Sequence, residues 1–214
     1  MRLRKKPWIS EALDKYGDLV YKGADSQFQG RWRQLFGRAA PLYVELGTGK
    51  GRFISEMAIR FPNVNFIGIE AQQDVLYYGA QKVAAADLTN VRLLVFDINN
   101  ITEIFAPGEI NRLYINFCDP WPKSRHGKRR LTHRRFLAMY QQLLAPGGAI
   151  HFKTDNRDLF DFSLAELTDQ GWRVEHVTYD LHNSPYNAGN VMTEYETKFS
   201  AFGPIHRLEA FPSS

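Results

Sequence analysis

Four acidic residues stand at or next to the ends of short apolar runs, where carboxylates can receive a small ligand. They are Glu45, Glu70, Asp97 and Asp119. In an open parallel sheet, the carboxyl ends of the strands line the ligand crevice, so acids at these positions would meet at one edge. An acid at a single strand end is commonly a helix cap or turn residue. Four in succession favour a ligand site.

A glycine-rich turn accompanies the first acid, in the pattern acid-x-Gly-x-Gly-x-Gly over 45–51. Glycines at Gly47 and Gly49 allow a sharp turn and a close backbone approach to a ligand. The pattern is not a phosphate-binding loop, because a glycine follows the lysine, nor a dinucleotide fingerprint, because position 52 is arginine. A carboxylate beside the turn suits a ligand with a cationic amino group, such as S-adenosylmethionine (SAM). Glu70 falls 23 residues after Gly47, near the spacing at which an acid meets ribose hydroxyls.

The fourth acid, Asp119, precedes a basic block. Residues 121–135 contain seven Lys/Arg and no Asp/Glu, and Pro120 and Pro122 restrict the turn before them. Such a block attracts phosphate by a salt-dependent counterion release. The alternative is a solvated surface loop. The acid, the aromatic Trp121 and the two prolines together favour an active site that handles nucleic acid.

Composition predicts one cytoplasmic α/β domain. The chain has 214 residues and a net charge of +4, and no window approaches the roughly 18 apolar residues of a membrane span. The amino terminus lacks the apolar core of a signal peptide. Residues 1–6 and 121–135 hold eleven of the 27 Lys/Arg but none of the 23 acids, a distribution expected of a nucleic-acid contact surface. The single cysteine, Cys118, excludes an internal disulfide; it reads as a small core residue more readily than as a nucleophile. No His/Cys cluster suggests a metal.

Hydrophobic periodicity places these residues in alternating strands and helices. Strands are expected at 42–46, 64–70, 91–97, 112–118 and 149–153, and helices at about 51–61, 73–86, 132–144 and 156–170. Two further runs, 172–179 and 195–202, are expected to be strands that pair antiparallel. This order predicts a mostly parallel α/β sheet with right-handed crossovers, helices on both faces and a terminal antiparallel strand. Residues 1–35 read as a basic and aromatic appendage to a domain over 36–214.

Five motifs give the chain a resemblance to a known family over nearly its whole length. They are Glu-Leu-Gly-Thr-Gly-Lys-Gly (45–51), Gly-Ile-Glu (68–70), Asp-Pro-Trp-Pro-Lys (119–123), Phe-Lys-Thr-Asp-Asn (152–156) and Thr-Glu-Tyr-Glu (193–196). The chain resembles the bacterial tRNA (guanine-N7)-methyltransferases, which are class I (Rossmann-like) SAM-dependent enzymes. Cys118 departs from the expected Ser or Pro. The resemblance implies a tRNA partner, a SAM cofactor, a variable-loop guanine as target, no membrane, and a monomer or homodimer.

The same resemblance implies site roles. SAM would be bound by Glu45, Gly47, Gly49, Glu70, Asp97 and Asp119. The target nucleotide would be contacted by Lys123, Asp155, Thr193, Glu194, Tyr195 and Glu196, and the RNA by Arg125, His126, Gly127, Lys128, Arg129 and Arg130. For some of these residues, a purely structural role is the alternative to the site role. Asp155 could cap the helix that starts at 156, Glu194 and Glu196 could lie on a solvent-facing strand edge, Lys123 could merely be solvated, and Trp121 could anchor its loop instead of stacking on a base.

The chemistry needs no general base, because guanine N7 carries a lone pair and no proton. The protein must orient N7, which can contribute up to roughly 7–11 kcal/mol in the best cases. A carboxylate would stabilise the positive charge that develops on the ring, with Asp119 the first candidate and Asp155 the second. Other classes remain: a SAM methyltransferase of another RNA or of a small molecule, a non-catalytic RNA-binding domain, and a nicotinamide-dependent oxidoreductase. The basic block disfavours a small-molecule methyltransferase, and the presence of all four acids disfavours a non-catalytic RNA-binding domain. Arg52 and Glu45 disfavour the oxidoreductase.

Overall fold

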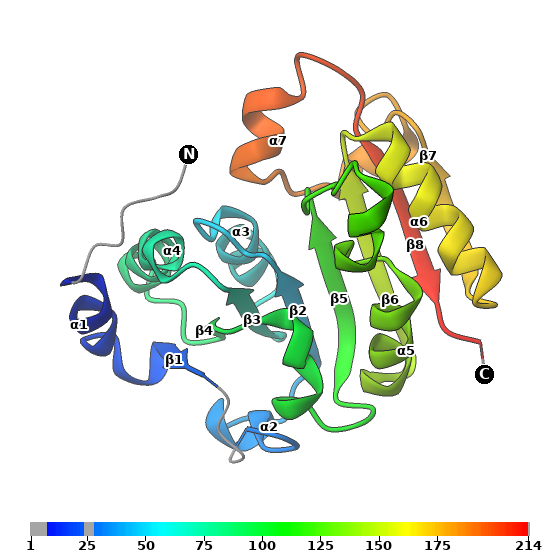
Figure 1. Cartoon of the computed structure of the whole chain (residues 1–214). Helices are drawn as coiled ribbons and strands as arrows, with labels where there is room; N and C mark the ends of the chain where they lie inside the picture. Colours follow the sequence, from blue (N-terminus) through cyan, green and yellow to red (C-terminus); the bar gives the residue numbers. More distant parts are fainter. Residues whose placement is uncertain (1–7, 24–27, 214) are drawn as a thin grey trace. The chain divides into compact units, whose positions relative to one another are not determined.

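The computed structural model describes residues 8–23 and 28–213. Contacts divide the chain into two compact units, Met1–Ile104 and Phe105–Ser214, each of which is described by itself (Figure 1). Arg2, Arg4, Lys5 and Lys6, which carry the basic charge of the amino-terminal segment, lie outside the described residues.

The first unit is built on four parallel strands. These are β1 (Val20–Lys22), β2 (Leu42–Leu46), β3 (Asn65–Glu70) and β4 (Val91–Val95), in the spatial order β1-β4-β3-β2. The helices are α1 (Trp8–Asp14), α2 (Trp32–Leu35), α3 (Arg52–Arg60) and α4 (Gln73–Ala85), with short 3-10 helices η1 (Gly17–Leu19) and η2 (Ile98–Glu103). β2 and β3 are buried along almost their whole length, as expected for a parallel sheet covered by helices.

Close backbone packing fixes the start of α3. Gly51 has a φ of +74°, and a Cβ on it would lie 3.0 Å from the Cα of Gly79 in α4. Gly68 in β3 is equally restricted, because a Cβ there would lie 2.9 Å from the Thr48 hydroxyl. The glycines therefore set both the position of α3 and the path of the turn that precedes it.

Part of the predicted appendage is built into this unit. β1 pairs with β4 through Val20 and Leu93. Trp32 is fully buried, and its Nε1 donates a hydrogen bond to the Ile104 carbonyl at 2.8 Å. The boundary after residue 35 stays a prediction.

The second unit is a mixed sheet. Its strands are β5 (Ile110–Asn116), β6 (Leu144–Thr154), β7 (Arg173–Thr178) and β8 (His206–Phe211), in the order β5-β6-β8-β7. β5 and β6 are parallel, whereas β8 is antiparallel to both β6 and β7. The helices are α5 (Arg134–Leu143), α6 (Arg157–Asp169) and α7 (Glu194–Phe199), with 3-10 helices η3 (Ser124–Arg129) and η4 (Pro185–Gly189). Helix α6 packs on β6 and β8 (Figure 1). The rings of Phe160 in α6 and Phe152 in β6 stack with their centroids 6.2 Å apart.

The predicted α/β class, with mostly parallel strands and a terminal antiparallel strand, is confirmed. The predicted strand at 195–202 is wrong. Thr193 caps a helix there, its Oγ1 accepting a hydrogen bond from the Glu196 amide at 2.9 Å, and the antiparallel partner of β7 is β8. Two boundaries also differ. β4 ends at Val95, so that Asp97 caps η2, and β6 begins at Leu144, its first residues forming an irregular register against β5.

Candidate functional site

In the first unit, the glycine turn is held in place by the strands it leaves. The amides of Gly47 and Thr48 donate to the Ile69 carbonyl at 2.8 and 2.9 Å. Glu45 is buried, and its Oε2 accepts a hydrogen bond from the Thr48 hydroxyl at 2.6 Å. Gly47 and Gly49 have φ angles of +78° and +59°, which residues other than glycine rarely adopt. A Cβ atom added to either glycine would have no heavy atom within 4 Å. Backbone conformation therefore requires these glycines, and the space in front of them is open.

Glu70 ends β3 and contacts this turn, whereas Asp97 follows the neighbouring strand β4. Glu70 Oε2 accepts from the Gly49 amide at 3.2 Å, and its Oε1 accepts from the Gln72 amide at 3.0 Å. Asp97 Oδ1 accepts from the amide and the side chain of Asn99 at 2.9 and 2.7 Å. Parallel pairing of Glu70 with Val95 places Asp97 two residues beyond the neighbouring strand position. Contacts thus gather Glu45, Glu70 and the two glycines at one turn, and the strand register puts Asp97 at the same edge of the sheet.

In the second unit, the backbone around Asp119 is strained. Phe117 and Trp121 have φ angles of 52° and 42°, in the left-handed region that bulky residues rarely adopt. Each such conformation costs on the order of 1–3 kcal/mol and persists only where the surroundings enforce it. The Phe117 amide donates to the Lys153 carbonyl at 2.8 Å. Between the two strained residues, Asp119 is exposed and makes no hydrogen bond or ion pair within the described part of the chain.

The basic block divides into residues that hold this loop and residues that extend from it. Arg130 donates from Nε to the Pro120 carbonyl at 2.9 Å and from Nη2 to the Trp121 carbonyl at 3.2 Å, and its guanidinium lies 4.3 Å from the Phe162 ring. The Trp121 ring packs against Arg129 and His126. Trp121 is therefore packed within its own loop, and stacking of its ring on a base stays a prediction. The exposed basic side chains of the loop are those of Lys123, Arg125, Lys128 and Arg129, and Arg134 and Arg135 are exposed at the start of helix α5.

Cys118 has no nucleophilic thiolate at neutral pH. Burial, reinforced by the negative charge of Asp119, raises the pKa of this thiol to about 12. A thiol with that pKa stays protonated and behaves as a small packing residue.

Asp155 does not cap helix α6. The cap is Asn156, whose Oδ1 accepts from the Leu159 amide at 2.8 Å. Asp155 is exposed, and its Oδ2 accepts from the hydroxyl of Tyr195 at 2.9 Å. Burial and this bond to Asp155 raise the pKa of Tyr195. The Tyr195 ring lies 5.1 Å from the ring of Phe117, so α7 connects Asp155 to the strained loop that carries Asp119.

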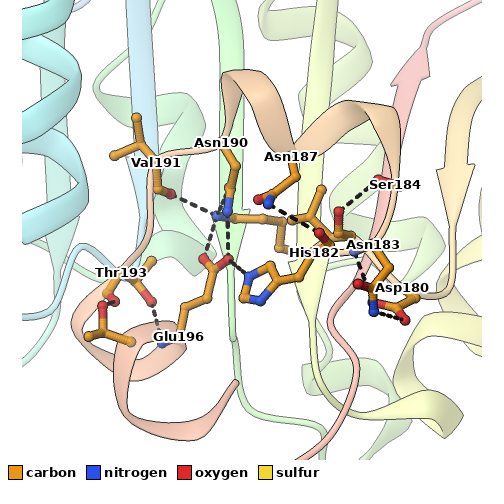
Figure 2. A network of polar contacts seen from close by, with 12 residues as sticks. Asp180, His182, Asn183, Ser184, Asn187, Asn190, Val191, Thr193 and Glu196 are labelled. Carbon is orange, nitrogen blue, oxygen red and sulfur yellow. Dashed lines mark hydrogen bonds and ion pairs between the residues drawn. The ribbon is translucent and has the colours of Figure 1, made fainter. Parts of the chain in front are cut away.

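Glu196 lies inside a buried polar network (Figure 2). Its Oε2 pairs with Lys153 Nζ at 2.7 Å, while Oε1 lies 2.8 Å from His182 Nε2 and accepts from Asn190 Nδ2 at 2.8 Å. Lys153 also donates to Asn190 Oδ1 and to the Val191 carbonyl, each at 2.9 Å. The side chains of Lys153 and Glu196 are only 8% and 0% exposed. The network therefore fastens the loop 182–191 and helix α7 to β6.

The expectation of a solvent-facing strand edge is wrong for Glu196. Burial alone would raise the pKa of its carboxyl, but the charge of Lys153 and the surrounding donors hold that pKa below its usual value. Sequence reasoning missed Lys153, His182 and Asn190. One signal was available for Lys153, a lysine within the apolar run that precedes Asp155.

Comparisons with known proteins place this arrangement in a family. The sequence matches the family described as "Putative methyltransferase" over residues 39–206. A relative from Lachnoclostridium phytofermentans, named tRNA (guanine-N(7)-)-methyltransferase, is 50% identical over 99% of this chain and 98% of its own length. The chain belongs to the tRNA (guanine-N(7)-)-methyltransferase family. A relative of the same name from Bacillus subtilis is 48% identical over 98% of each chain.

Solved structures agree on the fold of this tRNA (guanine-N(7)-)-methyltransferase family member. The 16S rRNA methyltransferase KamB matches with a TM-score of 0.67 at 13% identity, over 86% of this chain and 94% of its own. An antibiotic-related methyltransferase matches with a TM-score of 0.63 at 20% identity, over 85% and 91%. Both likenesses show a class I methyltransferase fold, as the sequence motifs predicted. Within the described ranges, no helix is long and apolar enough to span a membrane.

Proposed function

We propose that this protein transfers the methyl group of SAM to N7 of a guanine in tRNA. The observation that carries the proposal is the sequence identity of 50% and 48%, over nearly the full length, to two relatives named tRNA (guanine-N(7)-)-methyltransferase. The site supports it independently, because an exposed carboxylate stands on a strained loop beside a basic surface. The finer proposal is that the target is the variable-loop guanine and that the enzyme acts in the cytoplasm as a monomer or homodimer.

The first unit fits SAM. The open space in front of Gly47 and Gly49 admits a ligand against the backbone, the carboxylates of Glu45 and Glu70 contact the turn, and Asp97 follows the neighbouring strand. SAM, when bound, supplies a methyl group activated by a positively charged sulfur. We assign Glu70 to the ribose hydroxyls. The buried Glu45 contributes negative charge beneath the turn and holds Thr48. Asp97 keeps Oδ2 without a hydrogen bond in the described part of the chain, so that this oxygen is available to the ligand.

The second unit fits a guanine base. N7 needs no deprotonation, so the residues there have to orient the base and stabilise the positive charge that it gains. Asp119 and Asp155 are exposed carboxylates that can accept from the N1 and N2 hydrogens and offset this charge. Asp119 is assigned the catalytic role, because its strained loop is fixed by Arg130 and Lys153 before any ligand arrives. Fixed charges of this kind need no reorganisation during the reaction.

The remaining assignments follow from exposure. Lys123 and Tyr195 are exposed and are proposed to contact the target nucleotide, with Glu194 nearby on α7. Thr193 and Glu196 are buried, and we propose that they serve the nucleotide by holding α7 in place. Arg125, Lys128 and Arg129, with His126 and Gly127, are proposed to face the RNA backbone, whereas Arg130 supports the loop.

Methyl transfer from labelled SAM tests the proposal. Purified enzyme should label unmodified tRNA, and it should leave ribosomal RNA and RNA-free extract of small metabolites unlabelled. Asp119→Asn should abolish labelling while its melting temperature stays near that of the wild type, because Asp119 is exposed and unbonded in the described residues. Label in the small-molecule fraction, or in ribosomal RNA alone, would reject the assignment to tRNA.

A further inference from the structure

Four aromatic rings of the second unit form a continuous row. Phe117 contacts Tyr195 at 5.1 Å between ring centroids, Tyr195 contacts Phe199 at 4.3 Å, and Phe199 contacts Phe202 at 6.2 Å. The row leads from the strained loop outward along α7. Tyr195 is 41% exposed and Phe202 is 82% exposed. The outer end of the row is therefore the ring of Phe202, a large apolar side chain that is exposed to solvent.

The row is held by the buried network described above. Glu196, on the same helix as Tyr195 and Phe199, is fastened to Lys153 at 2.7 Å. At the inner end, the Phe117 amide bonds to the backbone of the same lysine. At the outer end, the Ser200 amide bonds to the Glu196 carbonyl and the Phe202 amide to the Phe199 carbonyl, both at 2.9 Å. The backbone that carries Phe202 is therefore held by hydrogen bonds, and a backbone ordered in advance loses less conformational freedom on binding.

Lys198 beside the row, and the basic residues that follow Phe117 in the sequence, suit a polyanion that carries planar rings. Lys198 Nζ lies 5.1 Å from the Phe199 centroid. The row begins two residues before Asp119, and Lys123, Arg125 and Lys128 extend from the segment that follows. Aromatic rings flanked by lysine and arginine are the combination that binds single-stranded nucleic acid, since every base offers a face for stacking.

We propose that Phe199 and Phe202 form a stacking surface for an unpaired nucleobase of the RNA substrate, next to the target guanine. This inference rests on the proposed function. A base that an enzyme draws out of its stack leaves its neighbour without a stacking partner. The row supplies one, because it continues outward from the tyrosine bonded to Asp155. Phe199 and Phe202 thus act on affinity for RNA without touching the reacting atoms.

Substitutions of Phe202 separate stacking from simple apolar contact. Phe202→Ala removes the ring, Phe202→Leu keeps apolar volume without an aromatic face, and Phe202→Tyr keeps the face. Ile59→Ala is the matched control, because Ile59 is an exposed apolar residue, 62% exposed, on α3. Binding of unmodified tRNA should be measured by fluorescence anisotropy at several salt concentrations, with sedimentation velocity for each protein.

Phe202→Ala and Phe202→Leu should weaken tRNA binding about 5- to 150-fold, while Phe202→Tyr and Ile59→Ala bind as the wild type does. The slope of log K against log salt should not change, since the ring neutralises no phosphate. Unchanged tRNA affinity in Phe202→Ala, or full affinity in Phe202→Leu, would overturn the proposal. A variant that loses self-association but keeps tRNA affinity would also overturn it and assign the row to a second copy of the chain. Failure of the proposed function would look different, because the wild type itself would then not methylate tRNA.

Discussion

Breaking the buried pair of Lys153 and Glu196 should destabilise the protein far more than breaking an exposed pair of the same length. Lys153→Met removes the ammonium but keeps an unbranched side chain of similar length. It leaves the Glu196 carboxylate 0% exposed, with His182 and Asn190 as its remaining side-chain partners among the described residues. Removing one member of a buried ion pair typically costs about 3–5 kcal/mol, because a charge stays buried without compensation.

The double variant Lys153→Met/Glu196→Gln removes both charges, so it should recover part of this loss. The matched control is Arg157→Met. Arg157 and Asp161 are also 2.7 Å apart, but their side chains are 60% and 47% exposed. Water screens such a pair, so its removal should change stability little.

Urea unfolding measures these free energies, and amide hydrogen exchange locates the change. Exchange in Lys153→Met should accelerate first in α7 and in the loop 182–191, which the network fastens to β6. Equal stability losses in Lys153→Met and Arg157→Met, or a double variant no more stable than the single one, would refute the reasoning.

Four further outcomes are expected. Glu70→Ala should weaken SAM binding by about 1–3 kcal/mol in isothermal titration, since charge-assisted bonds are lost; unchanged affinity would reject the ribose assignment. Asp119→Ala should lower turnover in single-turnover kinetics with little change in melting temperature, whereas a large drop in melting temperature would indicate a structural role. Removing Arg125 and Lys128 should reduce the salt slope of tRNA binding by about 0.7–0.9 for each phosphate that is no longer neutralised, and an unaltered slope would exclude this loop as the docking surface. Burial lowers the pKa of His151 from 6.5 to about 4. Between these pH values, the unfolded protein therefore binds a proton at His151 that the folded protein does not bind. Stability should therefore fall by up to about 3 kcal/mol as the pH drops from 6.5 toward 4, and His151→Gln should lack that part of the slope in urea titrations at stepped pH.

The first unit could be predicted well from local patterns. Apolar runs ending in acids predicted β2 and β3 nearly to the residue, and the glycine pattern identified the turn at 47–51. These features depend on hydrophobic periodicity and on backbone conformations that only glycine adopts easily. Hydrophobic periodicity and glycine positions can both be recognised from residues that are close together in the sequence.

The second unit was harder because its decisive interactions are distant in sequence. Nothing local predicts left-handed backbone at Phe117 and Trp121, since tertiary bonds impose it. The segment 193–199 carries Thr193 and Glu196 at the spacing of a capping box, which is a signal for a helix in this segment. The carboxylate of Glu196 is then used elsewhere, on a lysine 43 residues away. That pairing decides its burial and could not be read from the sequence.

Nucleoside mass spectrometry tests directly whether this protein methylates guanine N7 in tRNA. Unmodified tRNA incubated with the enzyme and SAM labelled in its methyl group should be digested to nucleosides, and a parallel sample should be cleaved chemically at methylated guanine. Label is expected in 7-methylguanosine alone, at one guanine of the variable loop, and none is expected with Asp119→Asn. Label in 1- or 2-methylguanosine, in an adenosine derivative, or at guanines throughout the tRNA would contradict it.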